Sequence, residues 1–287
     1  MPQQPDPTVA VHSRRTRRWH WTSLAAVAGG GLLVVAVQAA EGGALRSLFQ
    51  LPAALIVIGG TGLATLVTYQ PSAIRKAFTA AWFAFREDEE AFDTLGAQLV
   101  TLSVHAHRGG PAAIDQQIQH VRDPFLRNGL TLVADGVPTD LIRDSLAVER
   151  MAEEAREDLP VRLLESAAGY APTLGILGAV LGLMRLMENL PSPSALGRGI
   201  ALSFVATVYG IAVANLLLLP IASRLRELAV SRSRRRDLIT DALLDMHKRL
   251  NPRLVAQKAR GFANVPSVSD IVRQLQQDAP ARREATA

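Results

Sequence analysis

The sequence predicts an all-α integral membrane protein with four spans, a large cytoplasmic helical domain between spans 2 and 3, and a cytoplasmic C-terminal helix. Four long segments carry no charged residue, and a helix needs ~20 apolar residues to cross a bilayer. A charged stretch of 91 residues, 75–165, separates the second of these segments from the third. Basic residues flank the apolar segments mainly on one side, which sets their orientation.

Composition supports the membrane assignment. Of the 287 residues, 48% are hydrophobic, which is apolar for a chain with 20% charged residues. The net charge of +5 would suit nucleic acid, but the basic residues lie beside the apolar segments instead of forming one patch. The chain has no cysteine, which excludes disulfide frameworks, thiolate metal sites and cysteine nucleophiles. We therefore expect a membrane topology and no nucleic-acid partner.

The N-terminal part predicts a tail followed by a transmembrane hairpin. Residues 1–20 form a basic, proline-containing tail, and residues 21–40 carry no charge. Trp19 and Trp21 stand where interfacial aromatic residues belong. A cleaved signal peptide is the competing interpretation, but a second uncharged segment follows at 47–74. We therefore expect spans 1 and 2 to form one hairpin domain over 21–74.

The middle of the chain, 75–165, predicts water-soluble helices. Apolar residues recur there at helical spacing, and Gly109, Gly110 and Pro111 interrupt them as a turn. The segment 140–156 predicts an amphipathic helix leading into the third span. Its apolar stripe is expected to contain Leu141, Ser145, Val148 and Ala152.

Two further uncharged segments predict a second hairpin domain over 166–223. The first contains 19 uncharged residues, 166–184, and the second contains 25, 199–223. Pro172 fits the first turn of the third span, and Pro220 lies near the end of the fourth, where it costs a backbone hydrogen bond. These prolines are either helix boundaries or two flexible points at one membrane depth.

The remaining residues, 224–287, predict a cytoplasmic helix to about Leu250 and then a polar, disordered tail. In the two loops expected on the far side of the membrane, the only basic residues are Arg46, Arg185 and Arg198. By the positive-inside rule both termini are cytoplasmic, as in a multi-pass protein of the bacterial inner membrane.

No arrangement of residues predicts an enzyme, a cofactor or a metal site. The six histidines include no pair on one helix face, because the two-residue spacing of His105 and His107 points them in different directions. The glycine-rich segments lie inside apolar helices and lack the lysine of a phosphate-binding loop.

The third span has a face of small residues. Glycine or alanine recurs there at positions i, i+3, i+4 and i+7, namely Gly175, Gly178, Ala179 and Gly182. Small residues at this spacing allow another helix backbone to approach closely. We expect this face to serve helix packing.

The four spans contain hydroxyl groups but no ionisable residue. Ionisable residues inside membranes usually mark ion pathways, so this chain alone has no carboxylate to carry a proton. Ser203 and Thr207 share a helix face, and Thr173 adds a hydroxyl in the third span. Such hydroxyls either bond to their own helix carbonyls or line a polar cavity whose charge another subunit supplies.

Four sequence blocks together resemble the MotA/TolQ/ExbB family of ion-driven motor subunits, and in particular its flagellar stator branch. The blocks are 59–65, 123–136, 169–183 and 204–220, in the family's order. The resemblance covers roughly residues 22 to 260.

The resemblance implies a homopentamer around two copies of a MotB-like, single-span, peptidoglycan-binding subunit that supplies the membrane aspartate. It also implies contact with membrane lipids and with the rotor protein FliG. Pro172 and Pro220 match the motor prolines, and Thr207 and Ala179 match the pore-facing positions. Alanine at 179 favours protons, because sodium-driven relatives typically place a hydroxyl there.

The rotor-contact positions implied by the resemblance are Arg108 and Asp115, on either side of the glycine turn. The function expected is a proton-conducting stator subunit of a bacterial flagellar motor. The alternatives are a TolQ- or ExbB-type energiser of an envelope transport complex, and a membrane scaffold without ion flow.

Overall fold

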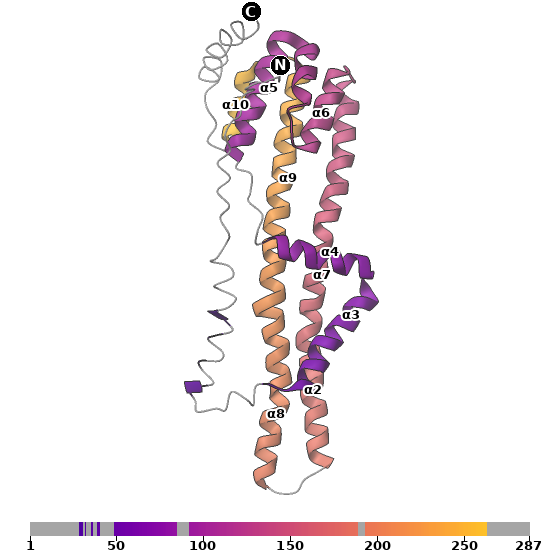
Figure 1. Cartoon of the computed structure of the whole chain (residues 1–287), viewed down its shortest axis with the longest axis vertical. Helices are drawn as coiled ribbons and strands as arrows, with labels where there is room; N and C mark the ends of the chain where they lie inside the picture. The colour runs from indigo at the N-terminus through magenta and orange to yellow at the C-terminus, as the bar shows by residue number, and fades with distance from the viewer. Residues whose placement is uncertain are drawn as a thin grey trace, which may run out of the picture. The chain divides into compact units, whose positions relative to one another are not determined.

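The computed structural model describes residues 49–84, 92–188 and 193–262, together with a few positions between 29 and 40. Every regular element in these residues is a helix (Figure 1). The N-terminal tail, most of the first predicted span and the tail after 262 lie outside the described residues. The elements are α2 (Leu51–Ala54), η2 (Leu55–Gly59), α3 (Gly60–Thr68), α4 (Pro71–Ala84), α5 (Phe92–Ile118), α6 (Pro124–Ala134), α7 (Thr139–Glu188), α8 (Pro193–Ala212), η3 (Val213–Leu218), α9 (Leu219–His247) and α10 (Pro252–Arg260).

The described chain forms two compact units. The first contains residues 92–154 and 230–262, and the second contains 49–84, 155–188 and 193–229. Helices α7 and α9 each contribute to both units. The boundary therefore falls inside helices, because an α-helix satisfies its own backbone hydrogen bonds and can continue from one environment into another.

Within the described residues, three helices are long and apolar enough to cross a membrane. They are Leu51–Thr68, the helix Thr139–Glu188 and the helical stretch Ser203–His247. These correspond to predicted spans 2, 3 and 4. The described residues therefore support three of the four spans, and the first predicted span at 21–40 lies mostly beyond them.

Span 2 is shorter than the uncharged segment 47–74. Its helix ends at Thr68, since Tyr69 has extended backbone angles (φ −126°, ψ 145°) and Pro71 starts α4. A residue that precedes proline disfavours helical backbone angles, so Gln70, just before Pro71, belongs to neither helix. The uncharged run therefore contains the span and the start of a second, separate helix.

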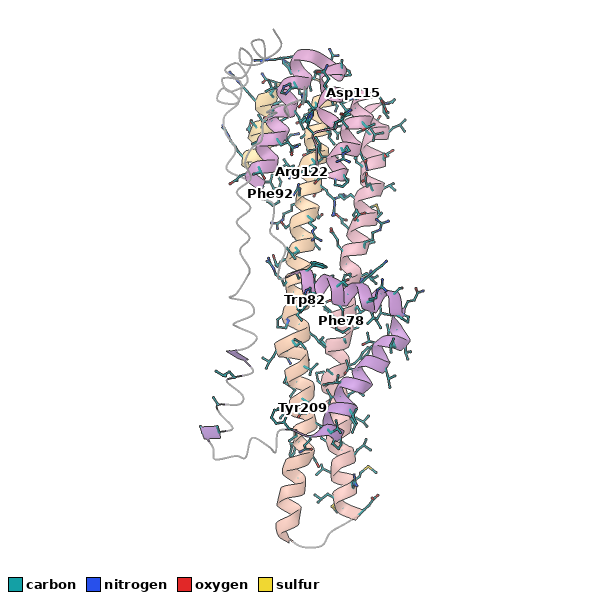
Figure 2. The ribbon with its side chains drawn as sticks, in the orientation of Figure 1. Phe78, Trp82, Phe92, Asp115, Arg122 and Tyr209 are labelled. Atoms are coloured by element: carbon teal, nitrogen blue, oxygen red, sulfur yellow. The ribbon has the colours of Figure 1, made fainter. Side chains whose placement is uncertain are left out.

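Helix α4 has an exposed aromatic face. Phe78, Trp82 and Phe83 are all more than half exposed, whereas Ala77 and Ala84 are buried. Figure 2 labels Phe78 and Trp82 on this helix. The small residues of this helix therefore face the protein and the large aromatic ones face away from it.

The predicted interruption at 109–111 is confirmed. Gly110 has a left-handed backbone (φ 65°, ψ −155°), so α5 changes direction there, and Pro111 begins the second part. Glycine suits this position because it adopts positive φ without a steric penalty.

The core of the first unit lies between α5, α6, α7, α9 and α10. Helix α6 starts at an Asp123 cap whose Oδ1 accepts a hydrogen bond from the Leu126 amide at 3.0 Å. Its Gly129 lies directly against Leu243 of α9, which lets the two helices approach. The largest side chains with under 2% exposure in this core are Leu99, Leu126, Leu130, Ile142, Leu146, Ile239 and Leu243.

The predicted apolar stripe of α7 was wrong. Leu141 and Val148 are 59% and 67% exposed, whereas Ile142 and Leu146 are almost fully buried. Both sets have helical spacing, so the sequence alone did not decide between them. In the core of the first unit, α7 buries the helix face that contains Ile142 and Leu146, not the face that contains Leu141.

Of the two alternatives for Pro172 and Pro220, the structure does not support helix boundaries. Pro172 lies inside α7, which runs unbroken from Thr139 to Glu188 (Figure 1). Pro220 lies inside a helical stretch that continues from α8 through η3 into α9. The wide π-helical turn η3 immediately precedes Pro220, and such local adjustments are how transmembrane helices accommodate proline.

The C-terminal helix ends slightly earlier than predicted. Helix α9 ends at His247 instead of Leu250, and Arg249 then takes a left-handed conformation (φ 51°). A short helix, α10, follows from an Asn251 cap that accepts a hydrogen bond from the Arg253 amide.

The core of the first unit gives a direct stability test. Leu243→Ala should destabilise the protein by about 2 to 5 kcal/mol, because it removes a fully buried side chain and leaves a cavity. Leu254→Ala, at a leucine of α10 that is 43% exposed, is the matched control and should change little. Thermal unfolding and limited proteolysis of the detergent-solubilised protein measure both, and equal stability of the two variants would contradict the assigned core.

Candidate functional site

The candidate site lies where α7 and α8 pack through two stripes of small residues. The predicted stripe on α7 faces one on α8 that has the same spacing, formed by Ser203, Ala206, Thr207 and Gly210. A side chain at Gly175 would come within 2.8 Å of the Ala206 carbonyl oxygen and 3.1 Å of the Thr207 Cα. The predicted packing role of the small-residue face is therefore confirmed.

The same contact brings three of the four predicted ion-path residues onto one interface. Ser203 is 6% exposed, and its Oγ would lie 2.6 Å from a Cβ at Gly182. The Thr207 hydroxyl donates to the Gly175 carbonyl across the interface at 3.4 Å. Ala179 is 8% exposed on the small-residue stripe of α7. The hydroxyls of Ser203 and Thr207 thus face a neighbouring helix.

Thr173 lies elsewhere. Its side chain is exposed, and its hydroxyl donates to the Tyr170 carbonyl of the same helix at 2.8 Å. The local hydrogen-bonding alternative therefore describes this threonine, in contrast to Thr207.

Span 2 completes the wall behind this interface. Its Ile56 side chain would lie 3.3 Å from a Cβ at Gly178. Thr61 of the same helix is 6% exposed, and its hydroxyl oxygen has no hydrogen-bond partner among the described residues. Thr65 instead donates back to the Thr61 carbonyl at 2.7 Å. A buried hydroxyl group without a partner is unusual in native proteins.

Pro172 lies at the tightest point between α7 and α8. A Cβ at Gly210 would come within 2.5 Å of the Ala171 carbonyl oxygen and 3.0 Å of the Pro172 Cα. Because proline cannot donate a backbone hydrogen bond, α7 lacks one helical bond at this point. A turn of α7 that lacks one backbone hydrogen bond therefore rests directly on the backbone of α8.

Three tyrosines tie the two ends of span 2 to spans 3 and 4. The Tyr69 hydroxyl contacts Ser166 Oγ at 3.0 Å, and Thr68 Oγ1 contacts the Tyr170 hydroxyl at 3.1 Å. At the other end, the Tyr209 hydroxyl accepts from the Gln50 amide at 3.1 Å (Figure 2). Sequence analysis missed these contacts. The available indication was that Tyr69 and Tyr170 stand near the ends of otherwise apolar segments, whereas Tyr209 lies in the middle of one.

The charged residues that border spans 3 and 4 also interact. Arg226 Nη2 lies 2.6 Å from the Glu165 carboxylate, which joins the end of span 4 to the start of span 3. Arg224, the first charge after Pro220, has two buried guanidinium nitrogens without a hydrogen-bond partner among the described residues.

The predicted rotor-contact residues lie in the other unit. Arg108 and Asp115 are both exposed and stand on opposite sides of the kink at Gly110 (Figure 2 labels Asp115). Within the described residues, no three histidine, cysteine or acidic side chains are placed to hold a metal ion.

The chain is similar to a known family of membrane proteins and to several of its members. Residues 117–237 match the family model described as "MotA/TolQ/ExbB proton channel family". Motility protein A of Treponema pallidum is 32% identical over 80% of this chain and 88% of its own length. Motility protein A of Bacillus subtilis is 31% identical over 76% and 81%. The chain belongs to the MotA/TolQ/ExbB proton channel family.

Solved structures of MotA/TolQ/ExbB relatives share the fold. The flagellar MotAB stator complex from Bacillus subtilis superposes with a TM-score of 0.71 at 30% identity, over 79% of this chain and 92% of that chain. The C. jejuni MotAB structure superposes with a TM-score of 0.80 at 22% identity, over 85% and 96%. The α7–α8 interface and both prolines lie within the 117–237 family match.

The contacts around Gly210 predict that no side chain larger than hydrogen fits at this position. Gly210→Ala places a methyl group against backbone atoms of α7, which cannot move as a side chain can, and overpacking of this kind typically costs about 1 to 3 kcal/mol. Gly62→Ala is the control, because nothing lies within 4 Å of its added methyl group. Thermal stability of the purified protein should fall only for Gly210→Ala; a fall for both variants or for neither would contradict the interface.

Removing the tyrosine hydroxyl groups should lower the stability of the second unit modestly, and the losses should add from one contact to the next. Tyr69→Phe and Tyr170→Phe each remove one hydrogen bond while keeping the ring, so each should cost about 0.5 to 1.5 kcal/mol. Tyr209→Phe tests the opposite end of span 2 in the same way. Protease sensitivity of the α3–α4 junction in membranes should rise for the first two variants and remain unchanged for the third. A rise for all three alike would show that the contacts do not act locally.

Proposed function

We propose that the chain is a proton-conducting stator subunit of a bacterial flagellar motor, working as a homopentamer around two copies of a MotB-like, peptidoglycan-binding subunit. The observation that carries this proposal is the α7–α8 interface, where Ala179, Ser203 and Thr207 gather in spans that contain no ionisable residue. A proton path along these helices needs a titrating group from elsewhere. The similarity to the two proteins named Motility protein A supports a partner as its source.

The geometry of Thr207 suits a role in such a path. Its hydrogen bond to Gly175 is long at 3.4 Å, and hydrogen bonds weaken beyond about 3.2 Å. The hydroxyl group can therefore turn at small cost and donate to a carboxylate brought by the partner. A hydrogen bond to a charged group contributes about 1.5 to 3 kcal/mol, more than the weak bond it replaces.

The residue at 179 supports protons as the coupling ion. A desolvated sodium ion requires several oxygen ligands, and Ala179 offers none from its side chain. A proton requires only a titrating carboxylate and a hydrogen-bonded route. Thr173 stands on the exposed side of α7 and could contribute a hydroxyl group only from another direction.

The two prolines give a route for movement out of the membrane. Pro172 removes one backbone bond from α7 between the tyrosine contacts at 166–170 and the glycine contacts from 175 onwards. Pro220 follows the wide turn η3 before the cytoplasmic part of α9. A change of charge next to Thr207 would therefore bend α7 and α9 at these points in preference to others.

Membrane orientation follows from charge and from α4. We propose that both termini are cytoplasmic in the bacterial inner membrane, with Arg75 and Lys76 on the cytoplasmic side of span 2. The exposed Phe78 and Trp82 then lie at the lipid headgroups (Figure 2), where aromatic side chains are favoured. The first unit would reach the rotor protein FliG, with Arg108 and Asp115 as exposed contact residues.

Two alternatives remain testable. A TolQ- or ExbB-type energiser would pair with a short periplasmic transport subunit, and a scaffold would conduct no ions. The match over most of the length of proteins named Motility protein A favours the stator.

The test is restoration of rotation. Cells that lack their stator subunits should swim when they express this chain with the partner that co-purifies with it, and swimming should persist when potassium replaces sodium. Thr207→Val should lower swimming speed and ion flux, the latter about tenfold, because it removes a hydrogen bond to a charged group. Thr79→Val is the control, since Thr79 bonds only to its own helix in α4.

The outcomes separate the candidates. Ion flux without rotation, together with a partner that lacks a peptidoglycan-binding domain, would favour the energiser. A complex that forms but conducts no ions would favour the scaffold and contradict the proposal.

A further inference from the structure

Helix α4 lies at the charged border of spans 3 and 4. It shares a small apolar core with α7 and α9, which contains Ala84, Val161, Leu164, Ala222, Leu225 and Leu228. The two α7 residues come just before the uncharged run 166–184, and the two leucines of α9 come just after the run 199–223. Figure 1 shows α4 lying across these two helices instead of along them. In a bilayer, α4 would therefore lie at the level of the lipid headgroups.

The exposed face of α4 combines basic and aromatic side chains. Phe78, Trp82 and Phe83 are 71%, 64% and 58% exposed, and Figure 2 labels the first two. Arg75 and Lys76 are also exposed, and within the described residues neither side chain has an ion-pair partner. Arg75, Phe78 and Trp82 stand at positions i, i+3 and i+7, so they form one stripe along the helix. The basic pair supplies the only charges of α4, since the acidic residues at 87–90 come after the helix ends.

A face of this composition suits a membrane surface. Exposed aromatic rings are unfavourable in water, whereas at a bilayer interface their apolar parts are buried and basic side chains meet lipid phosphates. The opposite side of α4 is formed by small residues, with Ala77 and Ala84 buried against the protein. The large side chains therefore contact whatever surrounds the second unit at this level.

The charges favour lipid over a second copy of the chain as the occupant of this face. On α7, Glu165 pairs with Arg226 at 2.6 Å and Asp158 pairs with Arg162 at 2.8 Å. These carboxylates are therefore engaged within the chain that carries them. Anionic phospholipids instead offer phosphate groups at the level where α4 lies, and their charge complements the basic pair.

A further cation beside α4 is incompletely solvated. Arg224 lies between Ala222 and Leu225, in the turn of α9 that shares a core with α4. The residue is partly exposed, but its Nε and Nη2 are buried and have no hydrogen-bond partner among the described residues. A partly desolvated guanidinium group without a counter-ion is unfavourable. An anion next to its exposed part would stabilise it.

We propose that α4 is a binding site for anionic phospholipids, in which Arg75 and Lys76 bind the headgroup phosphate and the aromatic face contacts the acyl chains. Zwitterionic phospholipids also fit the aromatic face, but their headgroup carries a positive charge as well and gains less from the basic pair. Each basic side chain near an anionic membrane surface raises binding about fivefold. The proposal goes beyond the stator function, because it assigns a lipid class to the chain and does not depend on the ion that the complex conducts.

The first test uses Trp82 as a reporter. Trp19→Phe and Trp21→Phe leave Trp82 as the only tryptophan of the full chain. The purified chain is reconstituted into vesicles of phosphatidylcholine and phosphatidylglycerol, with bromine on the acyl chains of one lipid or the other. Brominated phosphatidylglycerol should quench Trp82 fluorescence several-fold more strongly per lipid molecule. Equal quenching by the two lipids would overturn the proposal, and so would no quenching by either, because protein would then cover α4.

The second test removes the charges. Arg75→Gln combined with Lys76→Gln should bring the two brominated lipids close to equal quenching, and Arg224→Gln should reduce the preference in part. Arg253→Gln combined with Arg260→Gln is the matched control, because it removes the same charge from exposed positions of α10 in the first unit. The control should keep the preference for phosphatidylglycerol. A preference that survives the first double change, or that the control also loses, would contradict a site on α4.

The third test separates a phospholipid from a soluble anion. Phosphatidylglycerol added to the detergent-solubilised chain should raise its unfolding temperature more than phosphatidylcholine does, because a ligand that binds the folded state stabilises it. Inorganic phosphate should not, since it has no acyl chain for the aromatic face. Stabilisation by inorganic phosphate alone would contradict the lipid as the occupant. Rotation and ion flux are measured separately, so failure of the lipid site would leave the stator function standing.

Discussion

The close approach of α7 and α8 is the constraint on which the membrane unit depends. Glycine in one helix stands opposite backbone atoms of the other at Gly175 and Gly210, with no room for a side chain, and Gly182 stands opposite the Ser203 side chain. In a bilayer, helices gain little from apolar burial and associate mainly through such packing and through hydrogen bonds. The same closeness lets Thr207 reach the Gly175 carbonyl on the opposite helix. Packing and the candidate ion path are therefore one structural feature.

This interface also determines where the chain can bend. Below it, Tyr69 and Tyr170 fix α7 to the end of span 2, and beyond it the glycine contacts fix α7 to α8. Pro172 lies just past the tyrosine contacts, at the first of the glycine contacts, where its Cα faces Gly210. A helix that is held on both sides of a missing hydrogen bond concentrates its deformation there.

Sequence patterns predicted those features that depend on residue spacing alone. The uncharged runs located spans 2 to 4, and the small residues at 175–182 predicted a packing face that the structure confirms. The turn at Gly110 followed from glycine and proline chemistry. The predictions failed where tertiary contacts choose between equivalent patterns. Ile142 and Leu146 are buried instead of the stripe that contains Leu141 and Val148, which has the same periodicity.

Other features had no local sequence signature. Pro172 and Pro220 left open in the sequence whether helices end there, but each lies inside a continuous helical stretch, because a helix satisfies its own backbone hydrogen bonds. The tyrosine contacts join residues 97 to 159 positions apart in the sequence.

The central claim is that this chain forms the wall of a proton path whose titrating group belongs to its partner. Proton flux into liposomes tests it most directly, with the purified chain alone compared with the chain and partner together. The account predicts flux only for the complex, and loss of that flux when the partner's transmembrane carboxylate is changed to an amide. Flux through the chain alone, or flux that survives this change, would contradict it.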